Sequence, residues 1–152
     1  MDLEAATIKH YLHVVFAGMD RLLDRLDDDS VNVRPSDWGT NSVAGLIVHC
    51  CELAPSWFET AGLGRHGERD RDGEFAAVAS IAELRTRVKA TLIRLDPLID
   101  DFVAGPTAGD HELRIFLPGD DRSDPALVLH VFEELFQHLG HMEVTADAVS
   151  QP

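Results

Sequence analysis

Hydrophobic residues recur at intervals of three and four along four stretches of the chain, with charged residues between them. The first stretch covers residues 3–26, the second begins near residue 41, the third covers residues 80–103, and the fourth begins at residue 124. This interval matches the turn of an α-helix, so each stretch is expected to form a helix with one apolar face. Four such helices predict an all-α protein, a four-helix bundle whose apolar faces share one core.

Polar residues mark where the second and third helices are expected to begin. Asn41 or Ser42 can accept hydrogen bonds from the first turn of the second helix. Ser80 and Glu83 have the spacing of a capping box in front of the third helix.

Proline residues refine the expected helix boundaries. Asp124 is expected to cap the fourth helix, with Pro125 at its first helical position. Pro55 and Pro97 lie inside the second and third stretches, where proline removes a backbone hydrogen bond. We therefore expect a kink near Pro55 and a kink or a break near Pro97.

Two connections between the helices differ in character. Residues 65–75 alternate in charge and are expected to form a solvent-exposed loop with local ion pairs. In the alternative, Arg69 or Arg71 of this loop binds a carboxylate of a substrate. Residues 111–118 are expected to include a short extended piece.

Length and charge restrict the class of protein. A chain of 152 residues predicts a single domain, residues 1–152. It has 13 basic and 27 acidic residues, a formal net charge of −14, which argues against nucleic acids and anionic membranes as partners. The chain begins with acidic residues rather than a basic secretory signal, and no apolar run is long enough to span a bilayer. A cytoplasmic protein is expected.

The two cysteines, Cys50 and Cys51, are adjacent in the second helix. Neighbouring side chains diverge on a helix, so a disulfide between these two is not expected. Core packing is the role predicted for both.

Candidate metal ligands lie on the second and fourth helices. His130, Glu134 and His138 recur every four residues, which aligns them on one face of the fourth helix. His49 lies among the apolar residues of the second helix, where its ring nitrogens need partners. Bundles build metal sites from inward-facing side chains of different helices, so we expect His49 to meet Glu134 and His138. In the alternative, these residues are ordinary core and surface residues.

The spacing of these residues excludes two common metal motifs. No glutamate is followed three residues later by histidine, as di-iron bundles require, and His-Glu-x-x-His is absent. Two histidines and one carboxylate leave coordination positions open, as catalytic metal sites do.

The sequence resembles the DinB-like superfamily in residues 41–49, 68–75 and 130–145. Within it, the resemblance is to the branch of mycothiol-dependent maleylpyruvate isomerases and mycothiol or bacillithiol S-transferases. It implies a DinB-like four-helix bundle with a divalent metal held by His49, Glu134 and His138. Zinc is the metal that the resemblance implies, and nickel or iron suit the same ligands.

The resemblance also implies a function, a metal-dependent S-transferase. The metal would activate a low-molecular-weight thiol, similar to mycothiol, for attack on an electrophilic small molecule. His141 or His130 would transfer a proton. A homodimer formed through helix faces is expected.

Two other functions fit the same residues. One is a non-enzymatic, DinB-like metal-binding protein with a stress or interaction role. The other is a non-haem iron oxygenase, since two histidines and a carboxylate also describe such centres. The resemblance favours thiol transfer over both.

Overall fold

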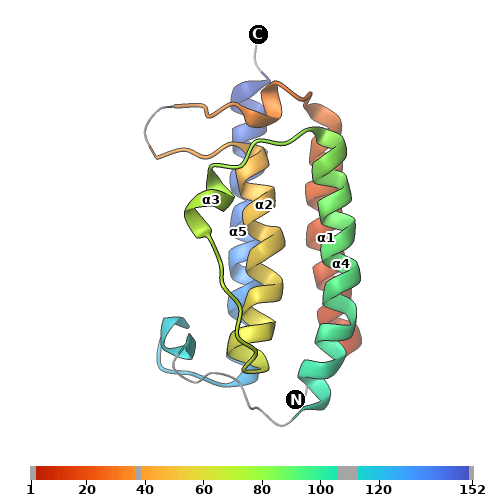
Figure 1. Cartoon of the computed structure of the whole chain (residues 1–152), viewed down its shortest axis with the longest axis vertical. Coiled ribbons are helices and arrows are strands. Elements are labelled where there is room, and N and C mark those ends of the chain that lie inside the picture. The colour runs from red at the N-terminus through yellow and green to blue at the C-terminus, as the bar shows by residue number, and fades with distance from the viewer. Residues whose placement is uncertain (1–2, 37–38, 106–112, 151–152) are drawn as a thin grey trace.

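Four long helices form a bundle in the computed structural model, which describes residues 3–36, 39–105 and 113–150 (Figure 1). The helices are α1 (Ala5–Leu22), α2 (Val43–Ser56), α4 (Ile81–Ala104) and α5 (Asp124–Val149). Their main contacts run from α1 to α4, from α4 to α2, from α2 to α5, and from α5 back to α1. The described residues include no strand. The expected all-α four-helix bundle is confirmed.

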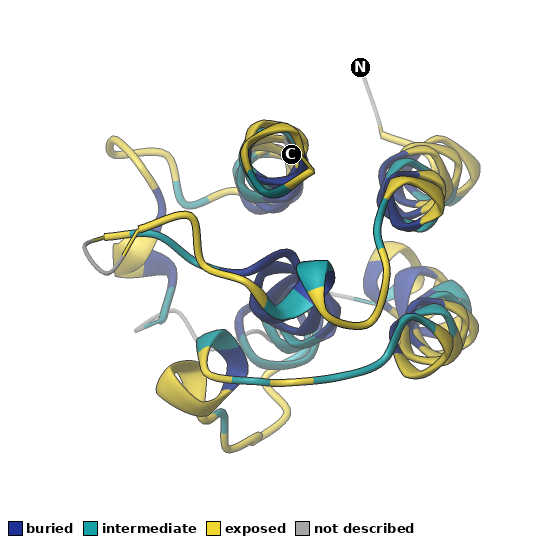
Figure 2. Cartoon of the chain, turned by 90° about the horizontal axis from the view of Figure 1, so that it is seen from above, coloured by how far each residue is buried: buried dark blue, intermediate teal, exposed yellow. Residues whose placement is uncertain are grey.

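The apolar faces of the four helices meet in one core, as the view along the bundle shows (Figure 2). Each helix buries the residues that recur at three- and four-residue intervals, because these point to one side of a helix. Fully buried examples from the four helices are Phe16, Met19, Leu46, Ile47, Leu95, Ile99, Val131 and Leu135. Cys50 and Cys51 are buried free thiols in this core, which confirms their predicted packing role.

The helix starts expected for α2 and α4 are confirmed. Ser42 caps α2, and its hydroxyl oxygen accepts from the backbone N–H of Gly45 at 3.1 Å. Ser80 and Glu83 form the capping box of α4, with each side chain accepting from the backbone N–H of the other residue.

The start of α5 differs from the expectation. Ser123, not Asp124, caps the helix, and its hydroxyl accepts from the backbone N–H of Ala126 at 3.3 Å. The Asp124 carboxylate instead accepts from Nη2 of the buried Arg114 at 2.8 Å. A buried guanidinium needs a charged partner more than the helix end needs a carboxylate, so the shorter serine becomes the cap.

Pro55 and Pro97 affect their helices differently. Of the kink or break expected near Pro97, the break is wrong, because α4 continues from Ile81 to Ala104. Pro97 and Ile93 are both exposed, so water can satisfy the Ile93 carbonyl that proline leaves unbonded. Near Pro55 the helix changes type, and α2 passes into the π-helix η3 (Trp57–Gly62).

The expected extended piece at residues 111–118 is also wrong where the structure describes it. Residues 111 and 112 lie outside the described residues, and the next four form the 3₁₀ turn η4 (Leu113–Phe116). Arg114 is 1% exposed and donates to the Ala61 and Arg122 carbonyls as well as to Asp124. These bonds attach η4 to η3 and to the start of α5.

The charged connection after η3 is only partly a loop. Its last residues form the short helix α3 (Arg71–Phe75), capped by Asp70, which packs on α2. Gly45 of α2 allows this close approach, because a Cβ atom there would lie 2.6 Å from the Phe75 carbonyl oxygen. α3 therefore lies directly beside the helix that carries His49.

Across the described ranges, no helix has the length and apolar character needed to cross a membrane.

Candidate metal centre

The three candidate ligands come from two helices that pack against each other. His49 lies on α2, and Glu134 and His138 lie one turn apart on α5. One ligand atom from each residue lies within 4.8 Å of the others. Glu134 Oε2 and His138 Nε2 are 3.5 Å apart, near the roughly 3.4 Å that separates two ligands of one tetrahedral zinc ion. The rings of His49 and His138 meet edge to face, with centroids 4.7 Å apart.

A buried carboxylate holds the ring of His49. Nδ1 of His49 lies 2.9 Å from Oε2 of Glu74, a residue of α3 that is 6% exposed. Arg69 Nη2 also lies 3.1 Å from Nδ1, but it donates to Glu74 at the shorter distance of 2.7 Å. A carboxylate only accepts hydrogen bonds, so we assign the proton of the neutral ring to Nδ1. This assignment leaves the lone pair on Nε2, the nitrogen available for a metal. Carboxylates commonly orient metal-binding histidines in this way.

The surroundings of the Nε2 atom of His49 indicate whether these residues fit a metal ion. Nε2 is buried, and it has no hydrogen-bond partner in the part of the chain that the structure describes. An unsatisfied buried polar atom costs about 1–3 kcal/mol, and an ion held among the three residues would satisfy it. Two imidazoles and one carboxylate suit zinc, and they suit nickel and iron as well. The residues present fit a divalent metal.

Arg69 neutralises the carboxylate behind His49. Its Nε donates to Glu74 Oε1 and its Nη2 donates to Glu74 Oε2, both at 2.7 Å. This paired geometry is the strongest form of an arginine–carboxylate contact. Arg69 is thereby bound to Glu74 and takes part in supporting the candidate centre.

The charge states of the ligands favour metal binding. Burial lowers the pKa of His49 to about 3, and the charges of His138 and Arg69 act in the same direction. The hydrogen bond with His138 lowers the pKa of Glu134 below its usual value, although burial acts against it. At neutral pH, His49 is therefore neutral and Glu134 is ionised, as metal ligands must be.

We expect the metal-free protein to lose stability as the pH falls below about 6.5. The unfolded chain protonates His49 near pH 6.5, whereas the folded chain does so only near pH 3. Between these values the unfolded state binds more protons, so the contribution present above pH 6.5 is lost progressively. The expected loss between pH 7.5 and pH 5.5 is about 1.4 kcal/mol. Urea unfolding at both pH values, with a chelator present, measures it.

His49→Asn is the control for this pH effect. Asparagine does not titrate, and its amide can still donate to Glu74. The variant should lose about 1.4 kcal/mol less than the parent over the same pH interval. Equal losses in both proteins would show that His49 is not the group responsible.

Glu74→Gln is expected to lower zinc affinity by about tenfold to a hundredfold. Glutamine keeps the size of the side chain, but it removes the charge that orients His49 and makes the ring more basic. Competition with a chromophoric chelator measures the affinity. Glu52→Gln is the matched control, because Glu52 pairs with Arg87 on the surface. An affinity equal to that of the parent would mean that Glu74 does not support the centre.

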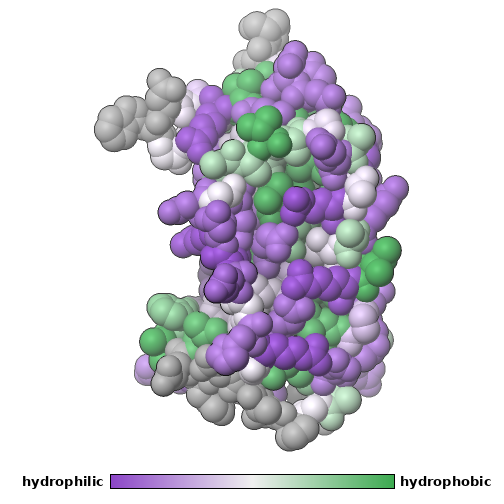
Figure 3. Space-filling model, in the orientation of Figure 1, coloured by the Kyte–Doolittle hydropathy of each residue, from purple (hydrophilic) through white to green (hydrophobic). Residues whose placement is uncertain are grey.

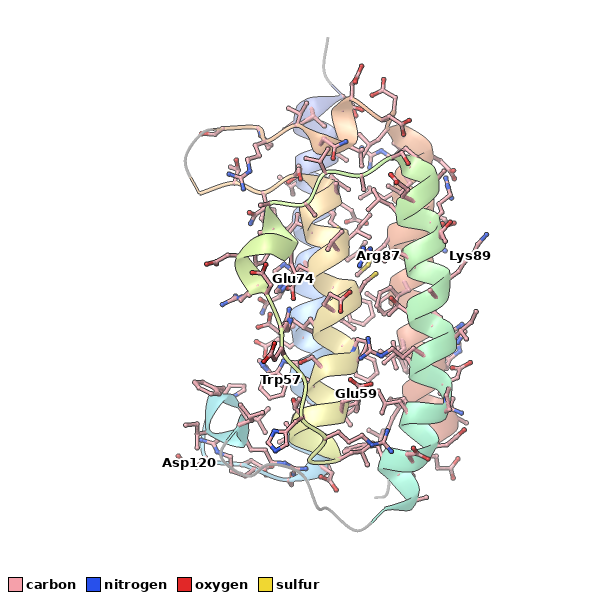
Figure 4. The ribbon with its side chains drawn as sticks, in the orientation of Figure 1. Trp57, Glu59, Glu74, Arg87, Lys89 and Asp120 are labelled. Atoms are coloured by element: carbon pink, nitrogen blue, oxygen red, sulfur yellow. The ribbon has the colours of Figure 1, made fainter. Side chains whose placement is uncertain are left out.

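A cavity of about 450 Å³ opens beside the candidate ligands. Two of the three candidate ligands, His49 and Glu134, line it, together with residues of α2, η3, α3, η4 and α5. Trp57 of η3 and Glu74 of α3 lie on the same side of the bundle in Figure 4. The remaining lining residues are Leu53, Ser56, Trp57, Thr60, Gly67, Arg69, Arg71, Leu113, Phe116 and His130. This size suits a small organic molecule.

The other residues singled out in the sequence lie at different distances from the cavity. His130 lines it, meets Trp57 edge to face at 4.9 Å, and has Nδ1 3.4 Å from Glu133. His141 is one turn beyond His138 and is not among the lining residues. Burial lowers the pKa of His141.

Two residues of this region were not identified from the sequence as part of a site. Glu74 lies in a run of residues that alternate in charge. In the sequence, only the neighbouring Phe75 indicates that this end of the run is buried. Trp57 belongs to the π-helix η3, which includes it in the cavity wall. π-Helical turns are often found at functional sites, although they have no simple sequence pattern.

The chain matches the family model described as mycothiol-S-transferase over residues 7–150. No curated protein and no solved structure matches it. The matched residues include all three candidate ligands, the supporting Glu74, and every residue that lines the cavity.

Proposed function

The chain belongs to the mycothiol-S-transferase family, and from this membership and the geometry of the centre we propose that it transfers a low-molecular-weight thiol to an electrophilic small molecule. The single observation that carries this proposal is the buried Nε2 of His49, which has no hydrogen-bond partner among the described residues, in a residue that groups with Glu134 and His138 at the wall of a cavity. A site of this kind would hold a metal beside a cavity whose size suits a small organic reactant.

His49, Glu134 and His138 would hold a divalent ion, with zinc as the first candidate. Such an ion lowers the pKa of a thiol bound to it, so that the thiolate is the main form at neutral pH. With these three residues as ligands, a coordination position would remain for a thiol sulfur. The charge of the ion and Glu134 together is +1, which a thiolate would neutralise.

His130 is the residue to which we assign proton transfer. It lines the cavity one turn before Glu134, and its Nδ1 lies 3.4 Å from Glu133, so Nε2 is the nitrogen to which we assign the contact with a reactant. In the reaction, a bond forms between sulfur and the electrophilic carbon, and the leaving group departs with the electrons of its bond. The proton of the thiol passes to His130 and from there to the leaving group or to water. We assign His141, which lies behind His138, a supporting role.

The test combines metal content and turnover in protein without an affinity tag. We expect close to one zinc per chain and zinc-dependent formation of a thioether from mycothiol and 1-chloro-2,4-dinitrobenzene. Glutathione and bacillithiol, tested in parallel, measure the preference for the thiol. The His130→Gln variant should keep its zinc and lose most of the rate, about a hundredfold.

Three outcomes would count against the proposal. No metal after incubation with zinc or nickel would contradict the centre itself. Metal without turnover for any thiol would favour a non-enzymatic metal-binding protein. Full activity of His130→Gln would assign the proton transfer elsewhere.

A further inference from the structure

One arginine of the cavity wall has no carboxylate partner among the residues that the structure describes, and we propose that this residue, Arg71, binds an anionic group on the electrophile. The inference rests on the proposed transferase function and specifies its second substrate by class. That substrate would combine an apolar body with a carboxylate or a similar anion. The two arginines of the cavity and its apolar wall carry the argument.

The two arginines differ in what they already bind. Arg69 already donates two hydrogen bonds of 2.7 Å to the Glu74 carboxylate. The side chain of Arg69 is only 23% exposed. A second carboxylate could take Arg69 only by leaving Glu74 buried and uncompensated, which is costly. Arg71 is exposed and has no ion pair or hydrogen bond to any residue that the structure describes. Its guanidinium is available for a ligand.

A stack of side chains positions Arg71 near the candidate metal ligands. The Arg71 guanidinium lies over the Phe75 ring, 5.7 Å from its centroid. The same ring stacks on His49, with centroids 4.1 Å apart and an angle of 23°. A cation–π contact uses none of the N–H donors of a guanidinium in a hydrogen bond, so they stay available for an anion. Arg71 and the candidate ligand His49 thus contact the same aromatic ring.

Another part of the cavity wall is apolar. Leu53, Trp57, Leu113 and Phe116 line it, and Phe116 is 67% exposed. In Figure 3 hydrophobic colour covers the lobe that contains η4, and the surface is hollowed between this lobe and the region of α3. Together with Arg71, these residues match a ligand that has an apolar body and one negative end.

Because the protein carries a large net negative charge, an anionic ligand needs a positively charged side chain at its binding site. With a net charge of −14, the protein repels anions at long range. An anionic electrophile would therefore need a specific donor inside the cavity, and among the described lining residues Arg71 is the arginine without an ion pair.

Binding by the metal-free protein tests this inference without turnover. The probes are 3,5-dinitrobenzoate and its uncharged analogue 3,5-dinitrobenzamide, which quench the fluorescence of Trp57 in a Trp38→Phe background. We expect the benzoate to bind about tenfold more tightly than the amide, and Arg71→Gln to abolish the difference. Lys89→Gln is the matched control, because it removes one positive charge from the exposed surface of α4 and should change nothing (Figure 4). Equal binding of both probes by the parent would overturn the inference.

Turnover then identifies which reactant carries the anion. With mycothiol and zinc, 4-chloro-3,5-dinitrobenzoate should have a kcat/KM about tenfold above that of the corresponding benzamide, and Arg71→Gln should remove this preference. If the variant slows both electrophiles equally, Arg71 acts on the thiol and the inference is wrong. A benzoate preference in binding with no turnover would support the anion site and contradict the transferase function, so the two can fail separately.

Discussion

Replacing His49 by alanine is expected to lower zinc affinity about a thousandfold. Zinc sites in small domains contribute about 10–16 kcal/mol in total, so one ligand contributes about 4 kcal/mol. His49 is the only candidate ligand from α2, and its loss would leave Glu134 and His138 on a single helix. Competition with a chromophoric chelator at pH 7.5 measures the affinity, and circular dichroism checks that the variant is folded.

Two further variants make this test specific. His138→Ala changes a more exposed ligand, so it should lose zinc with less effect on the core. His13→Ala removes an exposed histidine that contacts Asp96 on the outer surface and should bind zinc as the parent does. Parent-like affinity in both His49→Ala and His138→Ala would locate the metal elsewhere.

Arg114→Met is expected to destabilise the protein by about 3 kcal/mol. The arginine is 1% exposed, and its removal would leave the Ala61 and Arg122 carbonyls and the Asp124 carboxylate without their donor. Breaking a buried, hydrogen-bonded charge costs about 3–5 kcal/mol, and the partial exposure of Asp124 places the effect at the lower end. For a chain of this size, thermal unfolding should shift down by roughly 9 °C.

Arg94→Met is the control for Arg114→Met. Arg94 also makes a paired contact with a carboxylate, that of Glu59, but on the surface of the bundle. Its loss should cost less than about 1 kcal/mol. Equal destabilisation by the two variants would mean that the burial of Arg114 has no energetic importance.

The parts of the fold that depend on local patterns were predictable from the sequence. Helical periodicity located all four long helices, and the capping box at Ser80 was found as expected. The convergence of His49 with Glu134 and His138 followed from a different kind of observation. A histidine on an apolar face needs a partner, and two potential ligands at a four-residue interval supply one in a bundle.

The parts that depend on tertiary contacts were not predictable. Ser123 and Asp124 are both good caps, and only the buried Arg114 decides between them. Glu74 looks like any other charge in its segment until α3 packs on α2 and places it behind His49. Both cases involve a buried charge whose partner is distant in the sequence or on another element.

Because α3 is short, we expect it to unfold locally more easily than the four long helices. This five-residue helix carries both the acceptor behind His49 and the guanidinium that lies over Phe75, and it packs chiefly on α2. A local opening that lifts α3 away would dismantle the surroundings of the ligands while the four-helix core stays folded. Amide hydrogen exchange should therefore be faster in α3 than in α2 and α5. The surroundings of the candidate ligands would then open more often than the four-helix bundle unfolds.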